Sequence, residues 1–225
     1  MRPIYEPKGK AREYSELAIN IYTGCPHGCF YCFAPAVLHK DRETFHTMVQ
    51  PRKYIVEEVR KQLEKEKITG KLIHLCFTCD PYPTGYDSTP TREIVQLLKE
   101  SGNHVKILTK GSGRRDLDLL SKGDWYGVTF DGVDQPEREA IKIADLKEAR
   151  NNGINTWVSF EPVVNADNVL RLMVELAFVD AIKIGKLNYH PSDIDWNWFG
   201  HKAEMTCQAL GLDYYIKESL RECMR

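Results

Sequence analysis

Short apolar runs rich in β-branched residues alternate along this chain with longer stretches of helical periodicity, and each run is short enough to form a buried strand. Six strands are expected, at Leu17–Tyr22, Leu72–Thr78, His104–Thr109, Trp125–Phe130, Asn155–Phe160 and Asp180–Ile184. Helices are expected between and after them, at Lys53–Lys67, Thr91–Ser101, Arg115–Leu120, Pro136–Asn152, Ala166–Ala177 and Lys202–Leu210. The pattern therefore predicts six βα units in succession.

Residues at the ends of two of these helices support the assignment. Pro90-Thr91 stands where one helix begins, and Ser101-Gly102 where it ends. Pro136 begins another helix, which stops at Asn152-Gly153. Proline is favoured in the first turn of a helix and glycine just after its end.

Successive βα units imply a parallel sheet with right-handed crossovers. The periodicity leaves two closures open, a doubly wound open sheet and an incomplete (β/α)₆ barrel. The chain has 225 residues, of which 42% are hydrophobic, and this size suits one core. We therefore expect a single domain over residues 1–225, with a helical and aromatic extension from about residue 188 to 225.

Composition limits the cellular compartment and the classes of partner that we expect. Lys and Arg number 31 against 32 Asp and Glu, so no overall charge attracts nucleic acid or acidic membranes. No apolar run has the length of a membrane span, and the first residues lack the apolar region of a signal peptide. Seven cysteines, an odd number, suit a reducing compartment. These features predict a cytoplasmic protein with no membrane partner.

Three of the cysteines, Cys25, Cys29 and Cys32, lie in one glycine- and proline-containing stretch, the loop 24–34. Thiolates at this spacing can surround one [4Fe–4S] cluster, which normally takes four cysteine ligands. Three protein ligands leave one iron open for substrate chemistry. The alternatives are buried structural thiols or part of a zinc site. Zinc prefers four ligands in paired units, and His27 lies too near in sequence to turn readily onto the same metal.

The string Asn-x-Tyr-x-Gly-Cys-x-His-Gly-Cys-x-Tyr-Cys, which starts at Asn20, resembles the radical S-adenosylmethionine (SAM) superfamily. In particular it is similar to its spore photoproduct lyase-like branch, also labelled DNA repair photolyase. The resemblance implies a partial barrel of six βα units with the cluster loop after the first strand. It also implies two cofactors, a [4Fe–4S] cluster and SAM.

The resemblance further implies a reaction. A low-potential donor of the flavodoxin or ferredoxin type reduces the cluster, SAM is cleaved to methionine and a 5′-deoxyadenosyl radical, and the radical abstracts hydrogen from a C–H bond. The protein would position the reactants and exclude water.

Active sites of parallel α/β folds collect at the carboxyl ends of the strands. By resemblance, the backbone at Tyr31 contacts the adenine of SAM, and Asp80 binds its amino group, where a carboxylate suits an ammonium. Lys110 would pair with the SAM carboxylate. Thr129 and Glu161 would contact ribose, methionine or substrate. The alternatives are packing for Tyr31, a turn cap for Asp80, a surface charge for Lys110 and strand propensity for Thr129.

Lys186 and Asn188, after the last expected strand, are further candidates for substrate contact, with loop capping as the alternative. In spore photoproduct lyases, a cysteine that returns hydrogen lies three residues before the aspartate. Here that position is Phe77. Alternation along a strand would send Phe77 and Cys79 to the same face, so Cys79 is the candidate catalytic hydrogen donor as well as a cofactor neighbour.

The other cysteines, Cys76, Cys207 and Cys223, are widely spaced; packing thiols are expected, and a second metal or redox site is the alternative. The segment 189–199 contains Trp196, Trp198 and Phe199. It would pack, cover the open end of a barrel or stack on a base.

Three functional hypotheses remain. The first is a radical SAM enzyme that acts on a nucleic acid or nucleotide. The second is a radical SAM activase or maturase that acts on a protein or peptide. The third is a non-catalytic metal-binding α/β module.

Overall fold

An eight-stranded sheet, in which the strands lie side by side in chain order, forms the centre of the computed structural model, which describes residues 2–225. Strand β1 is antiparallel to β2, and all later neighbours are parallel. The strands are β1 (Ile4–Tyr5), β2 (Leu17–Ile19), β3 (Leu72–Leu75), β4 (His104–Ile107), β5 (Trp125–Thr129), β6 (Asn155–Val163), β7 (Ala181–Lys186) and β8 (Asp213–Ile216). The sheet does not close on itself, as in a partial barrel.

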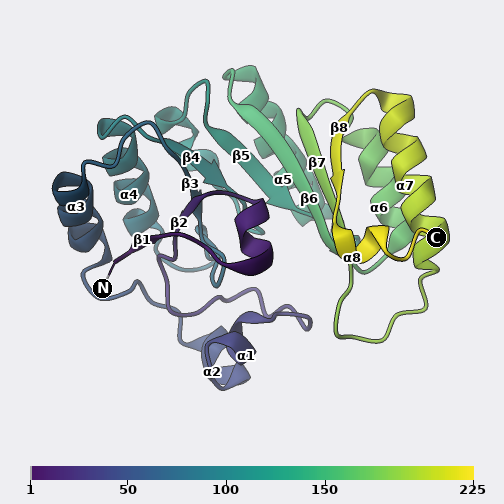
Figure 1. The fold of residues 1–225 in the computed structure, drawn as a ribbon, viewed down its shortest axis with the longest axis horizontal. Helices are drawn as coiled ribbons and strands as arrows, with labels where there is room; N and C mark the ends of the chain where they lie inside the picture. Colours follow the sequence, from purple (N-terminus) through teal and green to yellow (C-terminus); the bar gives the residue numbers. More distant parts are fainter. Residues whose placement is uncertain (1) are drawn as a thin grey trace.

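Helices connect the strands. They are α1 (Ala34–Val37), α2 (Arg42–Thr47), α3 (Ile55–Glu66), α4 (Thr89–Glu100), α5 (Pro136–Asn151), α6 (Ala166–Glu175), α7 (Trp196–Leu210) and α8 (Glu218–Arg221), with 3₁₀ segments η1 (Gly9–Glu13) and η2 (Arg114–Leu119). Figure 1 shows α3 to α7 along the outside of the curved sheet and the 3₁₀ segment η1 in front of the strands.

The six expected strands are all present, as β2 to β7, and the predicted α/β fold is confirmed. Several ends differ: β2 stops at Ile19 and β3 at Leu75, each three residues early, whereas β6 continues to Val163, three residues beyond the expected end. The expected helical and aromatic extension from about residue 188 contains α7 and α8, but it also contains a strand that was not expected, since residues Asp213–Ile216 form β8, parallel to β7. The sheet thus has seven parallel strands rather than six.

The predicted helices need three corrections. The segment expected as a helix at Arg115–Leu120 is the 3₁₀ segment η2. Helix α7 starts at Trp196, six residues before the expected Lys202, because the Asp195 side chain accepts a hydrogen bond from the Trp198 N–H at 3.0 Å and caps the helix. Helices α1, α2 and α8 were not expected.

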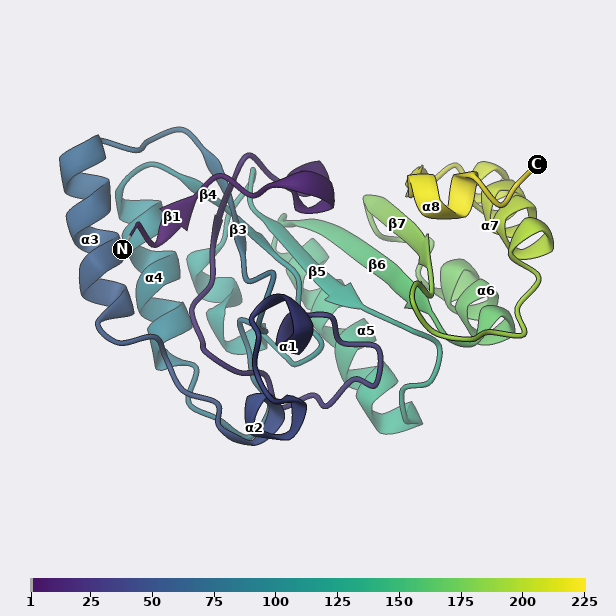
Figure 2. The same ribbon diagram turned by 60° about the horizontal axis from the view of Figure 1, so that its bottom comes forward.

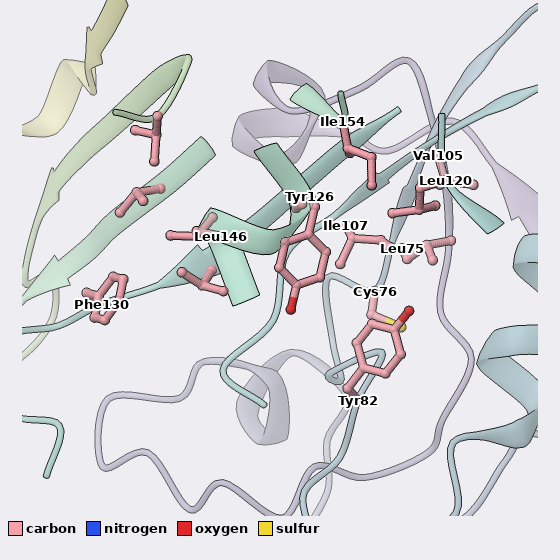
Figure 3. Packing of buried hydrophobic residues seen from close by; sticks show 14 of the residues in the cluster. Leu75, Cys76, Tyr82, Val105, Ile107, Leu120, Tyr126, Phe130, Leu146 and Ile154 are labelled. Carbon is pink, nitrogen blue, oxygen red and sulfur yellow. The ribbon is translucent and has the colours of Figure 1, made fainter. Parts of the chain in front are cut away.

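The hydrophobic core lies between the sheet and its outer helices. Alternate residues of the strands enter it, such as Leu75 and Ile107, and they meet Leu146 of α5 and Tyr126 of β5 in Figure 3. The intervening residues of the same strands point to the opposite face of the sheet, which we call the inner face.

The inner face differs sharply in composition from the core face. It carries His74 of β3, Lys106 of β4, Trp157 of β6 and Lys183 of β7, placed by contacts with one another and with Tyr14. Tyr14 directly follows η1, which Figure 2 shows between the β3–β5 region and the last strands. The parallel strands are therefore amphipathic, with polar side chains inside the curve.

Candidate active site at the carboxyl ends of the strands

The loop 24–34, which we call the cysteine loop, follows β2 and is held in place on one side by α2. Arg42 donates hydrogen bonds to the carbonyl oxygens of Cys29 and Cys32, the latter at 3.2 Å. Nδ1 of His46 lies 2.8 Å from the carbonyl oxygen of Cys25, whose N–H donates to Phe45. These bonds use main-chain atoms and leave the thiols to other partners.

Gly24 allows the loop to approach α2 this closely. A Cβ at this position would lie 2.6 Å from the carbonyl oxygen of Phe45 and 2.8 Å from that of Met48. Both are backbone atoms and cannot turn away, so only glycine fits here without movement of the loop.

Cys25, Cys29 and Cys32 are all free thiols and partly exposed. Burial raises the pKa of the Cys25 thiol, and the Asp80 carboxylate raises it further. Burial also raises the pKa of Cys32. Thiolates at these positions therefore need a strong positive partner, and iron ions supply one.

The donor set of the loop suits a cluster better than a single ion. Among residues 2–225, no three His, Cys, Asp or Glu side chains gather as the ligands of one metal ion would. Zinc needs such a tetrahedral set. In a [4Fe–4S] cluster each cysteine thiolate binds a different iron, and Cys25, Cys29 and Cys32 are three free thiols on one loop. The three residues fit the cluster.

Asp80 lies in the turn after β3 and is only 6% exposed. Its Oδ1 accepts from the Tyr82 N–H at 2.8 Å and the Thr109 hydroxyl at 2.5 Å. Its Oδ2 accepts from the Lys110 N–H at 2.8 Å and lies 3.1 Å from Nε2 of His27. Burial alone would raise the pKa of Asp80, but these donors, His27 first, hold it below its usual value. The carboxylate joins three loops.

His27, considered above only as a doubtful metal ligand, points away from the thiols toward Asp80. Its side chain is 4% exposed. The contact could not be foreseen from spacing, because it depends on the conformation of the loop; the His-Gly pair within the motif was the available signal.

Asp131, just after β5, forms a second junction. Its Oδ2 accepts a hydrogen bond from the Tyr31 hydroxyl and lies 2.8 Å from Nζ of Lys110. Burial lowers the pKa of Lys110, but the Asp131 and Cys29 charges outweigh it and raise the value. Tyr31 and Lys110, predicted separately as cofactor neighbours, are therefore brought together beside the cysteine loop, and Asp131 is the residue that joins them.

Glu161 of β6 contacts two groups that lie far from it in the sequence, and no local pattern predicts either contact. Its carboxylate accepts from the Tyr14 hydroxyl and lies 2.8 Å from Nζ of Lys217. Lys217 follows β8, the strand that was not expected. Thr129 is 7% exposed at the end of β5, and its carbonyl oxygen accepts from Nζ of Lys142 at 2.8 Å.

The expectation that Phe77 and Cys79 share a strand face was wrong, because β3 ends at Leu75 and the backbone of Cys76 turns with φ +67°. The Phe77 ring stacks on His74 with 4.3 Å between centroids. Cys79 accepts from the Tyr22 N–H, with 3.4 Å between N and Sγ. Burial raises the pKa of the Cys76 thiol, and the neighbouring Cys79 raises it further. Burial also acts to raise the pKa of Cys79, but hydrogen bonds from the Cys76 thiol and the Tyr22 main chain hold it below its ordinary value.

The remaining candidates have local partners. Nζ of Lys186 lies 3.4 Å from Sγ of Cys223, and the Asn188 side chain donates to the carbonyl oxygen of Lys186 at 3.1 Å. Cys207 is buried in the core. In the segment 189–199, Phe199 is buried but Trp198 is exposed. Trp198 and Phe30 of the cysteine loop both line a groove of about 500 Å³.

Residues 19–163 match the family described as the radical SAM superfamily. An uncharacterized protein of Mycobacterium tuberculosis (strain H37Rv) is 33% identical over 211 residues, covering 80% of this chain. The chain spans 61% of that relative's length.

Solved structures share the fold. A spore photoproduct lyase mutant superposes with a TM-score of 0.69 at 11% identity, covering 96% of this chain and 79% of the other. SuiB of Streptococcus suis, bound to SAM, gives a TM-score of 0.62 at 11% identity, covering 89% of this chain and 46% of the other.

Proposed function

The chain belongs to the radical SAM superfamily, and from this premise we propose that Cys25, Cys29 and Cys32 bind a [4Fe–4S] cluster in an enzyme that abstracts hydrogen from a nucleic acid or nucleotide. The family uses this cluster together with SAM, and its members are enzymes. Membership therefore favours an enzyme over a non-catalytic metal-binding module.

The observation that carries the proposal is the state of the cysteine loop. Its main chain is fixed by Arg42, while its three thiols are free. When bound, the cluster and SAM supply reductive cleavage of the sulfonium, with formation of a 5′-deoxyadenosyl radical. The protein supplies the shape and charge around it.

Lys110 would receive the carboxylate of SAM, since its ammonium is held beside the cysteine loop by Asp131. The Tyr31 main chain would contact the adenine, with the ring fixed by the hydrogen bond to Asp131. Asp80 remains the predicted partner of the SAM amino group. Its four contacts also support a positioning role, because through His27 it holds the loop against the ends of β3 and β4.

Thr129 and Glu161 would contact the ribose or methionine of SAM, or the substrate. The Tyr14 hydroxyl and Lys217 already orient the Glu161 carboxylate. Cys79 remains the candidate hydrogen donor, although the structure gives its thiol a buried neighbour, Tyr22, on one side. A low-potential reductant of the flavodoxin or ferredoxin type would supply the electron. No helix among residues 2–225 is both long and apolar enough to cross a membrane.

The test is anaerobic. The protein is reconstituted with iron and sulfide, mixed with dithionite and SAM, and assayed for 5′-deoxyadenosine with and without UV-irradiated DNA. We expect 5′-deoxyadenosine from the wild type and from Cys223→Ser, a cysteine outside the loop, and none from Cys29→Ala.

Stimulation of 5′-deoxyadenosine formation by the damaged DNA would support a nucleic acid substrate, and stimulation by a peptide substrate instead would favour an activase or maturase. No product from wild-type protein that holds its cluster would overturn the enzyme proposal.

A further inference from the structure

The inner face of the sheet holds more positive than negative charge. Lys106, Lys183 and Lys217 lie on it, with Glu161 and the neighbouring Glu13 as carboxylates. Both carboxylates lie near Lys217, Glu161 at 2.8 Å and Glu13 at 3.7 Å. The other two lysines are therefore left with little compensation.

Lys106 projects from the middle of β4. Its ammonium lies 4.7 Å from the ring centroid of Trp157 and 5.7 Å from that of Trp125. No carboxylate among residues 2–225 lies within ion-pair distance of it, and burial lowers the pKa of its amine. Contact with aromatic rings returns about 1 kcal/mol, which does not replace a counter-ion.

Lys183 projects from β7 toward the same region. Its Nζ donates to the Glu13 carbonyl oxygen at 2.9 Å and lies 3.9 Å from the centre of the Tyr14 ring. Burial, followed by the charges of Lys106 and Lys217, lowers the pKa of Lys183 to about 8. The proximity of the two ammonium groups of Lys183 and Lys106 therefore destabilises their charged forms when no anion is bound.

His74 lies beside Lys106, its partner in the β3–β4 register. The side chain is 1% exposed, and its Nδ1 has no hydrogen-bond partner among the described residues. Burial, then the charges of Lys106 and Lys183, lowers the pKa of this imidazole to about 3. A hydrogen bond to the Cys76 main chain acts in the opposite direction and raises this pKa. Nδ1 is thus the ring nitrogen that remains free to contact a ligand.

We propose that Lys106, Lys183 and His74 form a subsite for an oxyanion, a phosphate or carboxylate group carried by the substrate. A single anionic group would supply a counter-ion to both ammonium groups, which no described carboxylate does within ion-pair distance, and it would lie beside the unpartnered Nδ1 of the imidazole. Packing against aromatic rings accounts for the position of Lys106, but not for two neighbouring ammonium groups that both lack a carboxylate partner.

The subsite deepens the proposed function and rests on it. Lys106 precedes Lys110 by four residues, about 13 Å along an extended chain. A substrate anchored by its anionic group at Lys106 would extend from there toward the strand ends, where the cysteine loop lies. Trp157 and Tyr14 line the path, and such rings can hold a planar part of the substrate.

The test measures anion binding on the cluster-loaded protein without SAM or reductant. Thermal midpoints and tryptophan fluorescence are followed while inorganic phosphate, uridine 5′-monophosphate or succinate is added at constant ionic strength. The variants are Lys106→Met and Lys183→Met, which keep an apolar stem of similar length. Lys147→Met is the matched control, since this exposed lysine of α5 also lies over an aromatic ring, that of Phe178 at 5.8 Å.

We expect saturable binding of at least one probe to the wild type and to Lys147→Met, and at least tenfold weaker binding to both inner-face variants. The probe that binds most tightly distinguishes a phosphate from a carboxylate. Two separate variants, each checked for a cooperative thermal transition, guard against loss from misfolding.

Equal affinity in Lys106→Met and Lys147→Met, or no saturation by any probe in the wild type, would overturn the subsite. 5′-Deoxyadenosine formation is assayed separately. Failure of the proposed function, with no 5′-deoxyadenosine from cluster-loaded protein, is thereby distinguished from failure of the subsite.

Discussion

Nε2 of His27 lies 3.1 Å from Oδ2 of Asp80, and both side chains are almost completely buried. The contact links the middle of the cysteine loop to the turn after β3. Because the same carboxylate accepts from the Lys110 main chain and the Thr109 hydroxyl, the position of the loop depends on the ends of two strands at once.

Replacement of His27 by alanine should loosen this link. The Asp80 carboxylate would lose its contact with the buried imidazole, at a cost of about 2 kcal/mol. We expect His27→Ala to bind less iron after reconstitution and to unfold at lower urea concentration. His27→Gln, whose amide can donate, should recover part of both. Wild-type iron content in His27→Ala would show that the contact does not position the loop.

Asp131→Asn should remove the counter-ion of Lys110. Loss of a charged hydrogen bond to this group costs about 2 kcal/mol, measured by urea unfolding at neutral pH. Asp118→Asn is the control, because this exposed carboxylate pairs with Arg92 at the surface and should matter little.

The acid dependence of the same pair has a defined sign. Burial opposes ionisation, but Lys110 and the Tyr31 hydroxyl together hold the pKa of Asp131 below its usual value of 3.8. The stability that it contributes is thus complete above that pH and is lost as the pH falls through the lower, folded-state pKa. The difference between the wild type and Asp131→Asn should shrink only in that acidic range; a difference unchanged there would contradict the pairing.

Lys183 predicts a pH effect on stability in the alkaline range. Its pKa in the folded protein, about 8, lies below the ordinary 10.5, so the unfolded chain binds more protons between these values. Stability should therefore rise from about pH 8 to pH 10.5 by this contribution. Lys183→Met should lack the rise when unfolding is compared across that range. The charged or titratable groups that face Lys183 are Lys106, Lys217, Glu13, Glu161, Tyr14, Tyr215 and His74.

Gly127 gives a steric prediction. A Cβ there would lie 2.2 Å from Nε1 of Trp157, which donates to the Ile107 carbonyl oxygen at 2.9 Å. Gly127→Ala should displace the indole and destabilise the protein by about 2 kcal/mol. In a double-mutant cycle with Trp157→Phe, the alanine should cost less, because the smaller ring leaves room. Additive effects in urea unfolding would mean that the indole does not limit this position.

The strand pattern could be predicted because buried parallel strands are compositionally distinct. The apolar residues at alternate positions of β3 and β4 identified them despite His74 and Lys106 between them. Strand β8 was missed because Asp213 and two tyrosines dilute its apolar character, and it forms only by pairing with β7. Helix α2 was missed although Asp41 accepts from the Thr44 N–H at 2.8 Å, a local cap that needs no tertiary contact.

The site was predictable to the extent that it resides in contiguous residues. The cysteine loop and the strand ends gave Tyr31, Asp80 and Lys110. Two contacts join these residues, that of His27 with Asp80 and that of Asp131 with Lys110. Both depend on the conformation of the loop and on strands that are adjacent only in the folded sheet. Tyr14 and Lys217 meet Glu161 from opposite parts of the chain, and no local pattern records that.

The segment around Tyr14 has a consequence for how the chain folds as it is synthesised. Its hydroxyl bonds Glu161, 147 residues later, and the neighbouring Glu13 carbonyl accepts from Lys183, 170 residues later. Tyr14 and Glu13 are therefore synthesised well before their partners. Contacts of such long sequence separation form slowly. We therefore expect the polar interior to be assembled near the end of folding, after the outer helices have packed on the sheet.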